Sequence, residues 1–575
     1  MRMVTGVRVN MAHIQLHIVR TFSIKAIGCA LFVALLVTNT FAQKPAVPSD
    51  PLLAAMQAEL DRSQQELQLQ NMQRPFFIEY RLDDVQEYAA QASYGALTAH
   101  GGNHQRILRV TVRVGDYKAD SSSDRGDGVV QLAAADDDPA ALRYGLWSAT
   151  DNAYKAALRI YSDKQAALKG FQTPPTADDF AREKPTVKME PLVKLDMDTE
   201  TWSRHLAEAS GLYATDAATS SFAQDIEYCS ASMSAVAVNR YLVNTEGTVL
   251  RKGYTEYQVL VGAGTQAADG MRLDRSYGST AVSAKQLDAW DVFRKHETDL
   301  LLTLHDLRDA PVVAEEYHGP VLFSGDAAAD VVTRLFTPNI EADKPGMGTT
   351  ARTQGAYASS FKARVLPDFM DVVDDPAMKT FHGTALLGAY DVDDEGVPAQ
   401  VVDVVKKGVL MNYLVNRQPV KDFPESNGHG RAPVAQPARS HSSVLMLKSS
   451  ETVPAAEMAG KLVSMAKDQG RDVAYSVETL GPNLSPRLLY RIHTADGKRE
   501  LVRGAMFDEL DQRSLRSDIV AAGNDPYIAN SAGPVPTTTI VPSLLFGDIG
   551  VKRATQEQEK LPYYAPPPAL ASPAK

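Results

Sequence analysis

Acidic side chains gather in one short stretch, where Asp391, Asp393 and Glu395 stand at alternate positions and Gly396 follows. Carboxylates spaced in this way before a glycine match the start of a calcium-binding loop, because Ca²⁺ prefers oxygen ligands. The twelfth position of such a loop needs a bidentate glutamate, but here it is Val402. We therefore interpret the stretch as a structural turn, in which the glycine supplies the backbone freedom of a tight bend.

Imidazole side chains are the other candidate metal ligands in the C-terminal half, at His318, His382, His429 and His441. No two of them stand one helical turn apart, the spacing that puts two ligands on one face of a helix. Separate histidines, either exposed or hydrogen-bonded, are the plainer interpretation. A metal site formed by histidines and carboxylates that converge in space stays open as the alternative.

Other catalytic and cofactor patterns are weak in this sequence. Residues 262–264, Gly-Ala-Gly, imitate part of a dinucleotide fingerprint, but Asp-Gly at 269–270 follows where a phosphate-binding helix should begin. Cys229 follows Tyr228 in a strand-rich stretch and is interpreted as a core residue rather than a nucleophile. The chain contains neither a Gly-x-Ser-x-Gly elbow nor a P-loop.

The composition is that of an ordinary globular protein. Of the 575 residues, 44% are hydrophobic and 22% are charged, and the length predicts more than one domain. The formal net charge is −11 and no basic stripe occurs, which argues against a nucleic-acid partner.

The N-terminus has the pattern of an export signal. Basic residues precede an apolar run over residues 26–37, and the small residues Thr40 and Ala42 favour cleavage near Ala42. A membrane-spanning helix needs ~20 apolar residues, and this run is shorter. We therefore predict a signal peptide over residues 1–42 and a periplasmic or secreted protein that has no membrane span after cleavage. A lipoprotein anchored through Cys29 is the alternative.

The pattern of helices and strands expected from the sequence predicts an α+β fold in two domains. Residues 51–312 should mix a sheet with helices, and residues 313–555 should form a strand-rich, largely antiparallel layer. Residues 43–50 are interpreted as a linker and residues 556–575 as a Pro-rich tail. Apolar spacing predicts helices over 139–168, 199–211, 284–307, 327–336 and 455–467, another from Pro51, and strands over 76–82, 108–114, 319–323, 401–405, 409–415, 443–448, 487–493, 500–503 and 541–545.

Several segments resemble the TldD/PmbA family. Asp-Asp-Glu-Gly at residues 393–396 is followed by Pro398 and by an apolar hairpin over 401–415, whose charged turn lies at 406–408. Val-Asn-Thr-Glu-Gly at residues 243–247 resembles a turn in the N-terminal half of the family. The resemblance implies a scaffold shared by zinc peptidases and by partner subunits that have lost the zinc.

The zinc peptidases of this family carry His-Glu-x-x-x-His on a helix and a later cysteine as the third ligand. The imidazoles hold the ion and the glutamate activates water. In this chain the corresponding positions hold Thr333, Arg334, Thr337 and Pro338, and the C-terminal half has no cysteine. The resemblance therefore implies a pseudo-enzyme, with no catalytic residue and without zinc or another cofactor.

The glycine-containing loop over residues 427–431 provides the candidate substrate-binding residues, Asn427, His429 and Arg431. The loop resembles a family segment near the active cavity. Its mobile backbone and its guanidinium group suit contact with a carboxylate or carbonyl group of a peptide. A plain mobile loop without a binding role is the alternative.

These residues together predict a non-catalytic, peptide-binding subunit in proteolysis. Its partner would be a zinc-bearing paralogue, or a second copy of the chain in a dimer. Two alternatives stay open: an active metallopeptidase with relocated ligands, and a stand-alone peptide-binding homodimer.

Overall fold

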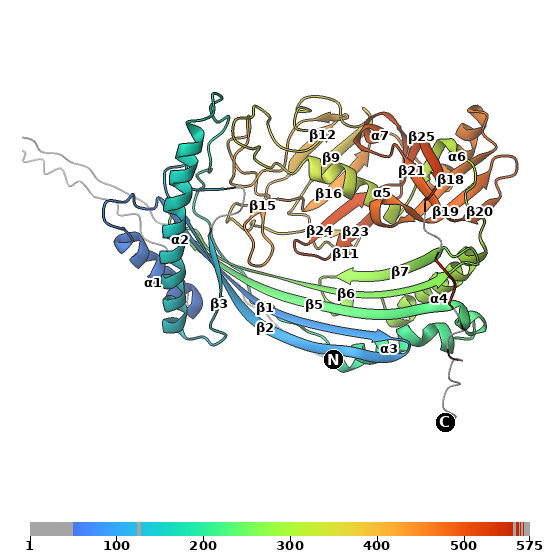
Figure 1. The fold of residues 1–575 in the computed structure, drawn as a ribbon, viewed down its shortest axis with the longest axis horizontal. Helices are drawn as coiled ribbons and strands as arrows, with labels where there is room; N and C mark the ends of the chain where they lie inside the picture. Colours follow the sequence, from blue (N-terminus) through green and yellow to red (C-terminus); the bar gives the residue numbers. More distant parts are fainter. Residues whose placement is uncertain (1–49, 124–127, 556–558, 563, 565–566, 568–575) are drawn as a thin grey trace, which may run out of the picture. The chain divides into compact units, whose positions relative to one another are not determined.

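The computed structural model describes residues 50–123, 128–555, 559–562, 564 and 567 (Figure 1). The predicted signal peptide over 1–42, almost all of the predicted linker and most of the predicted tail lie outside these residues. Residues 47–575 form one compact unit, and the predicted boundary between residues 312 and 313 stays a prediction. The α+β prediction is confirmed, because helices cover several mixed or antiparallel sheets.

The N-terminal part is built on one long, curved sheet (Figure 1). Its strand order is β3-β2-β1-β5-β6-β4, and β7 also pairs with β6. The strands are β1 (Phe77–Ser93), β2 (Ala96–Arg113), β3 (Val129–Ala133), β4 (Val187–Met189), β5 (Ile226–Asn244), β6 (Val249–Gln266) and β7 (Arg272–Ala281). Strands β5 and β6 form a hairpin at the turn noted over residues 243–247, with Val243 opposite Val249.

Four α-helices pack on this sheet: α1 (Pro51–Glu66), α2 (Pro139–Leu168), α3 (Thr199–Thr215) and α4 (Trp290–Asp309). Asp50 caps α1 by accepting hydrogen bonds from the amides of Leu52 and Leu53. The predicted helix over 284–307 is shorter in the structure and begins at Trp290. A 3₁₀ turn over Ala284–Gln286 precedes it, and the Asp288 amide then donates to the Ser279 hydroxyl at 3.0 Å, which holds the chain away from a helical path.

Strand β1 buries both of its faces over its first half. Tyr80 and Leu82 on β1 share an apolar core with α1 and α2. Arg81 and Asp83 point to the opposite face, yet only 2% and 1% of their surfaces are exposed, because the C-terminal part covers them. One direct contact between the two parts is the hydrogen bond from Arg240 Nη1 on β5 to the carbonyl of Ala432, at 3.0 Å.

The C-terminal part contains two larger sheets. The first has the order β13-β12-β9-β16-β24-β23, and the second has the order β17-β22-β25-β8-β18-β19-β20, with β21 beside β25. Their strands are β8 (Tyr317–Phe323), β9 (Met370–Asp374), β12 (Val402–Lys406), β13 (Val409–Leu410), β16 (Val444–Ser449), β17 (Thr452–Val453), β18 (Val473–Leu480), β19 (Pro486–His493), β20 (Arg499–Val502), β21 (Ala505–Asp508), β22 (Ile519–Gly523), β23 (Tyr527–Ser531), β24 (Thr537–Val541) and β25 (Leu544–Arg553).

Smaller elements complete the C-terminal part. Two short hairpins pair β10 (Thr380–Phe381) with β11 (Thr384–Ala385), and β14 (Gly430–Arg431) with β15 (Arg439–Ser440). The helices are α5 (Asp326–Val331), α6 (Ala455–Asp468) and α7 (Gln512–Ser517), and short 3₁₀ turns cover Ser220–Asp225 and Pro482–Leu484. None of the helices in the described part of the chain is long and apolar enough to span a membrane.

The predicted hairpin over 401–415 is shorter in the structure. Its first strand is β12, but its second strand, β13, ends at Leu410. The amides of Met411 and Asn412 both donate to the carbonyl of Val404, which breaks the regular register. The chain then leaves the hairpin, and Leu414 forms an isolated bridge with Glu341 instead.

Candidate functional site

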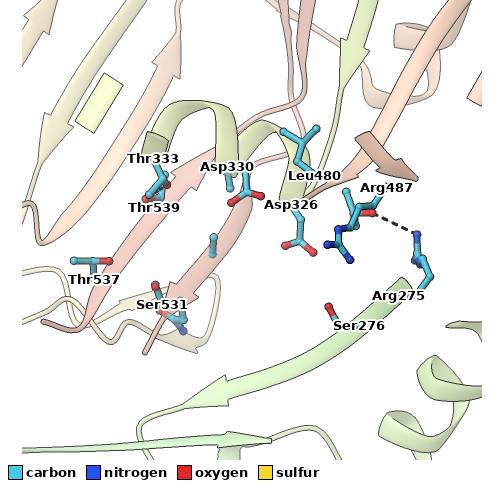
Figure 2. A pocket seen from close by; sticks show the side chains of 14 residues that line it. Arg275, Ser276, Asp326, Asp330, Thr333, Leu480, Arg487, Ser531, Thr537 and Thr539 are labelled. Atoms are coloured by element: carbon cyan, nitrogen blue, oxygen red, sulfur yellow. Dashed lines mark hydrogen bonds between the residues drawn. The ribbon is translucent and has the colours of Figure 1, made fainter. Parts of the chain in front are cut away.

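A polar pocket of about 280 Å³ lies where β7 of the N-terminal sheet approaches the C-terminal part (Figure 2). Strand β7 and the pair β23 and β24 contribute to its wall, together with α5 and the facing ends of β18 and β19. Most of the lining side chains are charged or carry a hydroxyl group, so the pocket suits a polar ligand. The residues used below are Arg275, Asp326, Asp330, Thr333, Thr479 and Arg487.

The predicted helix over 327–336 is broken at this pocket. Helix α5 ends at Val331, a π-helical turn covers Val332–Phe336, and a 3₁₀ turn covers Thr337–Asn339. Pro338 explains the break, since proline has no amide to donate and its ring clashes with the preceding turn. Irregular π-turns inside helices occur often at functional sites, and here the turn presents Thr333 to the pocket.

The residues at the zinc-motif positions do not fit a zinc ion. The Thr333 hydroxyl lies 3.3 Å from the Thr539 hydroxyl. Arg334 donates to the carbonyl of Gly481 at 3.0 Å and to Asp330 at 3.3 Å. A guanidinium group repels a cation, and neither threonine nor proline supplies the thiolate, imidazole or carboxylate that zinc needs. No group of three or more His, Cys, Asp or Glu side chains that could hold a metal occurs among the described residues.

Some of the charged side chains in the pocket have a partner of opposite charge and others do not. Burial raises the pKa of Asp330, and Arg334 partly offsets this effect. Asp326 accepts a hydrogen bond from the hydroxyl of Tyr527, whose own pKa is raised by burial and then by Asp326. Arg487 pairs with Asp274. Burial lowers the pKa of Arg275, whose Nη1 donates to the Thr479 hydroxyl at 3.3 Å (Figure 2).

Two of the three candidate substrate-binding residues, the buried His429 and the half-buried Asn427, are bound within the C-terminal part. His429 is fully buried, with Nδ1 3.0 Å from Asn427 Oδ1 and Nε2 3.2 Å from Asp374 Oδ1. Asn427 accepts from the amide of Val415 at 2.8 Å and donates to the carbonyl of Tyr413 at 2.8 Å. These bonds hold the loop in place, and neither residue lines the 280 Å³ pocket.

The third candidate, Arg431, borders a different pocket of about 310 Å³. Its guanidinium carbon stands 4.4 Å from the centre of the Tyr390 ring, a cation–π contact. Lys252 and Tyr254 of β6 line the same pocket. The structure therefore brings Arg431 to a cavity, whereas neither Asn427 nor His429 lines either of these two pockets. The substrate-binding role of all three stays a prediction.

We expect His429→Ala to lower the free energy of unfolding by about 1–3 kcal/mol, because it leaves the buried Asp374 without one polar partner. Urea denaturation measures this change. His441→Ala is the control, because His441 is partly exposed and its Nδ1 lies 3.5 Å from Glu341. Unchanged stability of the His429 variant together with weaker peptide binding would instead favour the substrate-binding role.

The acidic turn over residues 393–396 is held by a network of buried charges. Asp393 accepts hydrogen bonds from the amides of Glu395, Val397 and Gly430, at 2.9, 2.8 and 2.9 Å. Burial raises the pKa values of both Asp393 and Glu395, and the mutual repulsion of the two carboxylates adds to the rise for Glu395. These contacts are those of a structural turn.

Asp394 in the same turn bridges to the N-terminal sheet. Its Oδ1 lies 2.8 Å from Arg240 Nη1 and 2.6 Å from Lys252 Nζ, and its Oδ2 accepts from the Ala432 amide at 2.8 Å. The three nearby cations, Arg431 included, hold the pKa of Asp394 well below its usual value despite the burial. The sequence analysis identified the turn but missed these partners.

The remaining candidate residues have ordinary environments. His318 lies 3.5 Å from Glu316, and His382 stacks on Phe381. Cys229 is fully buried, and burial raises the pKa of its thiol to about 12. A thiol with that pKa stays protonated near neutral pH and is a poor nucleophile.

The residues that form the pocket carry no clear signal in the sequence. Arg275 and Ser276 lie on β7, whose sequence from Arg272 to Ala281 shows no regular apolar alternation. Asn530 and Ser531 lie on β23, which was not predicted either. Only the position of the zinc motif pointed to this region, through Thr333.

Comparison with known families gives a match in the C-terminal part. Residues 316–553 match the PmbA/TldA metallopeptidase C-terminal domain. No curated protein matches the chain.

Solved structures of similar fold cover most of the chain. A Thermotoga maritima protein, described as a proposed modulator of a DNA gyrase, aligns with a TM-score of 0.58 and 16% identity over 87% of this chain and 99% of its own. TldE from Thermococcus kodakarensis aligns with a TM-score of 0.58 and 11% identity, over 86% of this chain and 99% of its own. A Bacteroides thetaiotaomicron protein, also described as a proposed modulator of DNA gyrase, aligns with a TM-score of 0.56 and 13% identity. The alignment covers 87% of this chain and 98% of that protein's. At these identities the likeness shows a shared fold.

Proposed function

Residues 316–553 place this chain in the TldD/PmbA family, and on that premise we propose that it is an exported, non-catalytic subunit that binds peptides for a zinc-bearing paralogue. The observation that carries the proposal is the pocket at the broken helix. The scaffold keeps a polar cavity of about 280 Å³ at the zinc-motif position, where Thr333 and Arg334 cannot ligate the ion.

The walls of this pocket suit an extended peptide. Strand β23 is the last strand of its sheet, so one edge of its backbone is available to a further strand. An extended peptide can add to such an edge through main-chain hydrogen bonds. Hydroxyl groups at Ser276, Ser531 and Thr537 border the same pocket and provide side-chain donors and acceptors.

We expect the purified protein to contain far less than stoichiometric zinc and to hydrolyse no peptide by itself. Elemental analysis and a peptidase assay with and without a chelator measure these properties. Stoichiometric zinc, or chelator-sensitive hydrolysis by the lone chain, would favour the alternative of an active peptidase with relocated ligands. In that case His429→Ala or His382→Ala should abolish the activity.

Co-purification tests the partner in the same preparation. A tagged chain expressed with a paralogue that carries His-Glu-x-x-x-His should bring that paralogue down, and peptide hydrolysis should require both chains. Recovery of a homodimer without the paralogue would favour the stand-alone binding module. Cell fractionation with N-terminal sequencing tests export, which predicts a mature chain that begins after Ala42 in the periplasm or the medium.

Peptide binding is tested with a variant that fills the pocket. Ser531→Trp should abolish the binding of unstructured peptides, because an indole would occupy the space beside β23. Ser517→Trp is the matched control, since Ser517 is exposed on α7 and does not line the pocket. Equal peptide binding by the two variants would place the peptide elsewhere.

A further inference from the structure

Arg275 is the cation of the 280 Å³ pocket that the described residues leave without a carboxylate partner. Its one hydrogen bond goes from Nη1 to the Thr479 hydroxyl at 3.3 Å, and its buried Nε has no partner among the described residues. The two other arginines beside the pocket are both paired, Arg487 with Asp274 and Arg334 with Asp330. The pocket therefore has one guanidinium group that forms no direct ion pair within the described residues, and the carboxylates of Glu478 and Asp326 act on it only at longer range.

A largely buried charge without a counter-ion is costly, because burial removes water and nothing replaces it. Proteins retain such a group where a ligand supplies the missing charge. The planar guanidinium group binds a carboxylate through two parallel N–H···O bonds, and this geometry makes arginine the usual receptor for carboxylates. Arg275 lines the pocket and forms no ion pair there, so its guanidinium group is placed to receive the carboxylate of a ligand.

We propose that Arg275 binds a carboxylate group of the peptide ligand, an inference that rests on the proposed peptide-binding function. Asp326 also lines the pocket, where it accepts a hydrogen bond from the Tyr527 hydroxyl. It forms no ion pair within the described residues. A carboxylate near Asp326 would be repelled, so the ligand is oriented with its acidic group at Arg275 (Figure 2).

The carboxylate can come from the C-terminus of a peptide or from an Asp or Glu side chain. Four synthetic peptides of one unstructured sequence separate these sources. Two end in a free acid and two in an amide, and each pair carries either Glu or Gln at the internal positions. Fluorescence anisotropy of the full chain with each labelled peptide gives the dissociation constants.

We expect the wild-type chain to bind a carboxylate-bearing peptide about 10- to 100-fold more tightly than its neutral counterpart, the range of a charge-assisted hydrogen-bond pair. Arg275→Gln should remove this preference, and Arg275→Lys should keep part of it. Arg272→Gln is the matched control on the same strand, because Arg272 is exposed and pairs with Glu559. Its preference should equal that of the wild type.

Equal wild-type affinity for all four peptides would overturn the carboxylate assignment while leaving the peptide-binding function intact. Binding of none of them would overturn both. The wild-type comparison needs no variant, so it holds even where a substitution fails to fold. A second readout is the thermal midpoint of the ligand-free chain, which Arg275→Met should leave unchanged or raise, because the uncompensated charge is gone. A clear fall would assign Arg275 a structural role instead.

Discussion

Asp394→Asn is expected to lower the free energy of unfolding by about 3–5 kcal/mol, the usual cost of breaking a buried ion pair from one side. The substitution leaves Lys252 and Arg240 in the interior without the carboxylate that lies 2.6 and 2.8 Å from them. Arg240 keeps a second partner in Asp83, so the uncompensated charge falls mainly on Lys252. Urea denaturation at neutral pH, with equal slopes for the two proteins, measures the difference.

Asp391→Asn is the matched control for this experiment. Asp391 lies three residues upstream and also pairs with two lysines, Lys188 and Lys379, but its side chain is 37% exposed. Ion pairs with that exposure contribute about 0–1 kcal/mol, so the control should change stability little. Similar losses in the two variants would show that the buried pairing at Asp394 contributes no more than a surface pair.

The Asp394 effect has a defined pH dependence. The folded-state pKa of Asp394 is depressed by its cationic neighbours, so its contribution to stability is present above the ordinary carboxyl pKa of about 3.9. The contribution is lost as the pH falls through the depressed folded-state value. The difference between the wild type and Asp394→Asn should therefore shrink in strong acid.

Glu297→Gln should act in the opposite direction and stabilise the protein at alkaline pH. Glu297 on α4 is fully buried in the apolar core beneath β5, and neither of its carboxyl oxygens has a hydrogen-bond partner among the described residues. Burial raises its pKa to about 9, with smaller contributions from Glu208 and Asp216 that Arg294 opposes. The thiol of Cys229 faces it from β5.

A raised carboxyl pKa makes the folded state hold a proton that the unfolded chain releases near pH 4.3. Stability from this group is therefore fully present below that pH and is lost progressively as the pH rises through about 9. Glutamine cannot ionise, so Glu297→Gln should match the wild type at pH 5 and exceed it by about 2–4 kcal/mol at pH 8. Thermal and urea unfolding across this range measure the two profiles.

Asp299→Asn provides the comparison, because Asp299 lies two residues further along α4 and is exposed. Its profile should follow that of the wild type throughout. Identical pH profiles for the wild type and Glu297→Gln would mean that Glu297 does not hold a proton in the folded state at neutral pH.

Local elements that depend on capping and apolar spacing could be predicted from the sequence. Helix α2 spans residues 139–168 as expected, and the β5–β6 hairpin has the expected turn. Elements whose boundaries depend on tertiary contacts could not be predicted from the sequence. Strand β13 ends at Leu410 because the next two amides turn back to Val404, and no propensity of the residues themselves signals that change.

The same distinction between local and tertiary features applies to the candidate site. The absence of zinc ligands was visible in the residues at 333–338, but the charges that define the pocket were not. Arg81 and Asp83 alternate with apolar residues on β1, a pattern that predicts a solvent-facing polar side. The C-terminal part covers that side instead, so the alternating charges become buried partners of residues several hundred positions away.

The ion pairs from Asp394 to Arg240 and Lys252 limit which segments can be exchanged between related proteins. A gene fragment that begins at the family domain, at residue 316, would encode Asp394 and Arg431 but neither Arg240 nor Lys252. A chimaera that joins the N-terminal part of one relative to the C-terminal part of another therefore folds only when the buried charges of the two parts match. Recombination within this lineage should favour crossovers that keep the two segments from one parent.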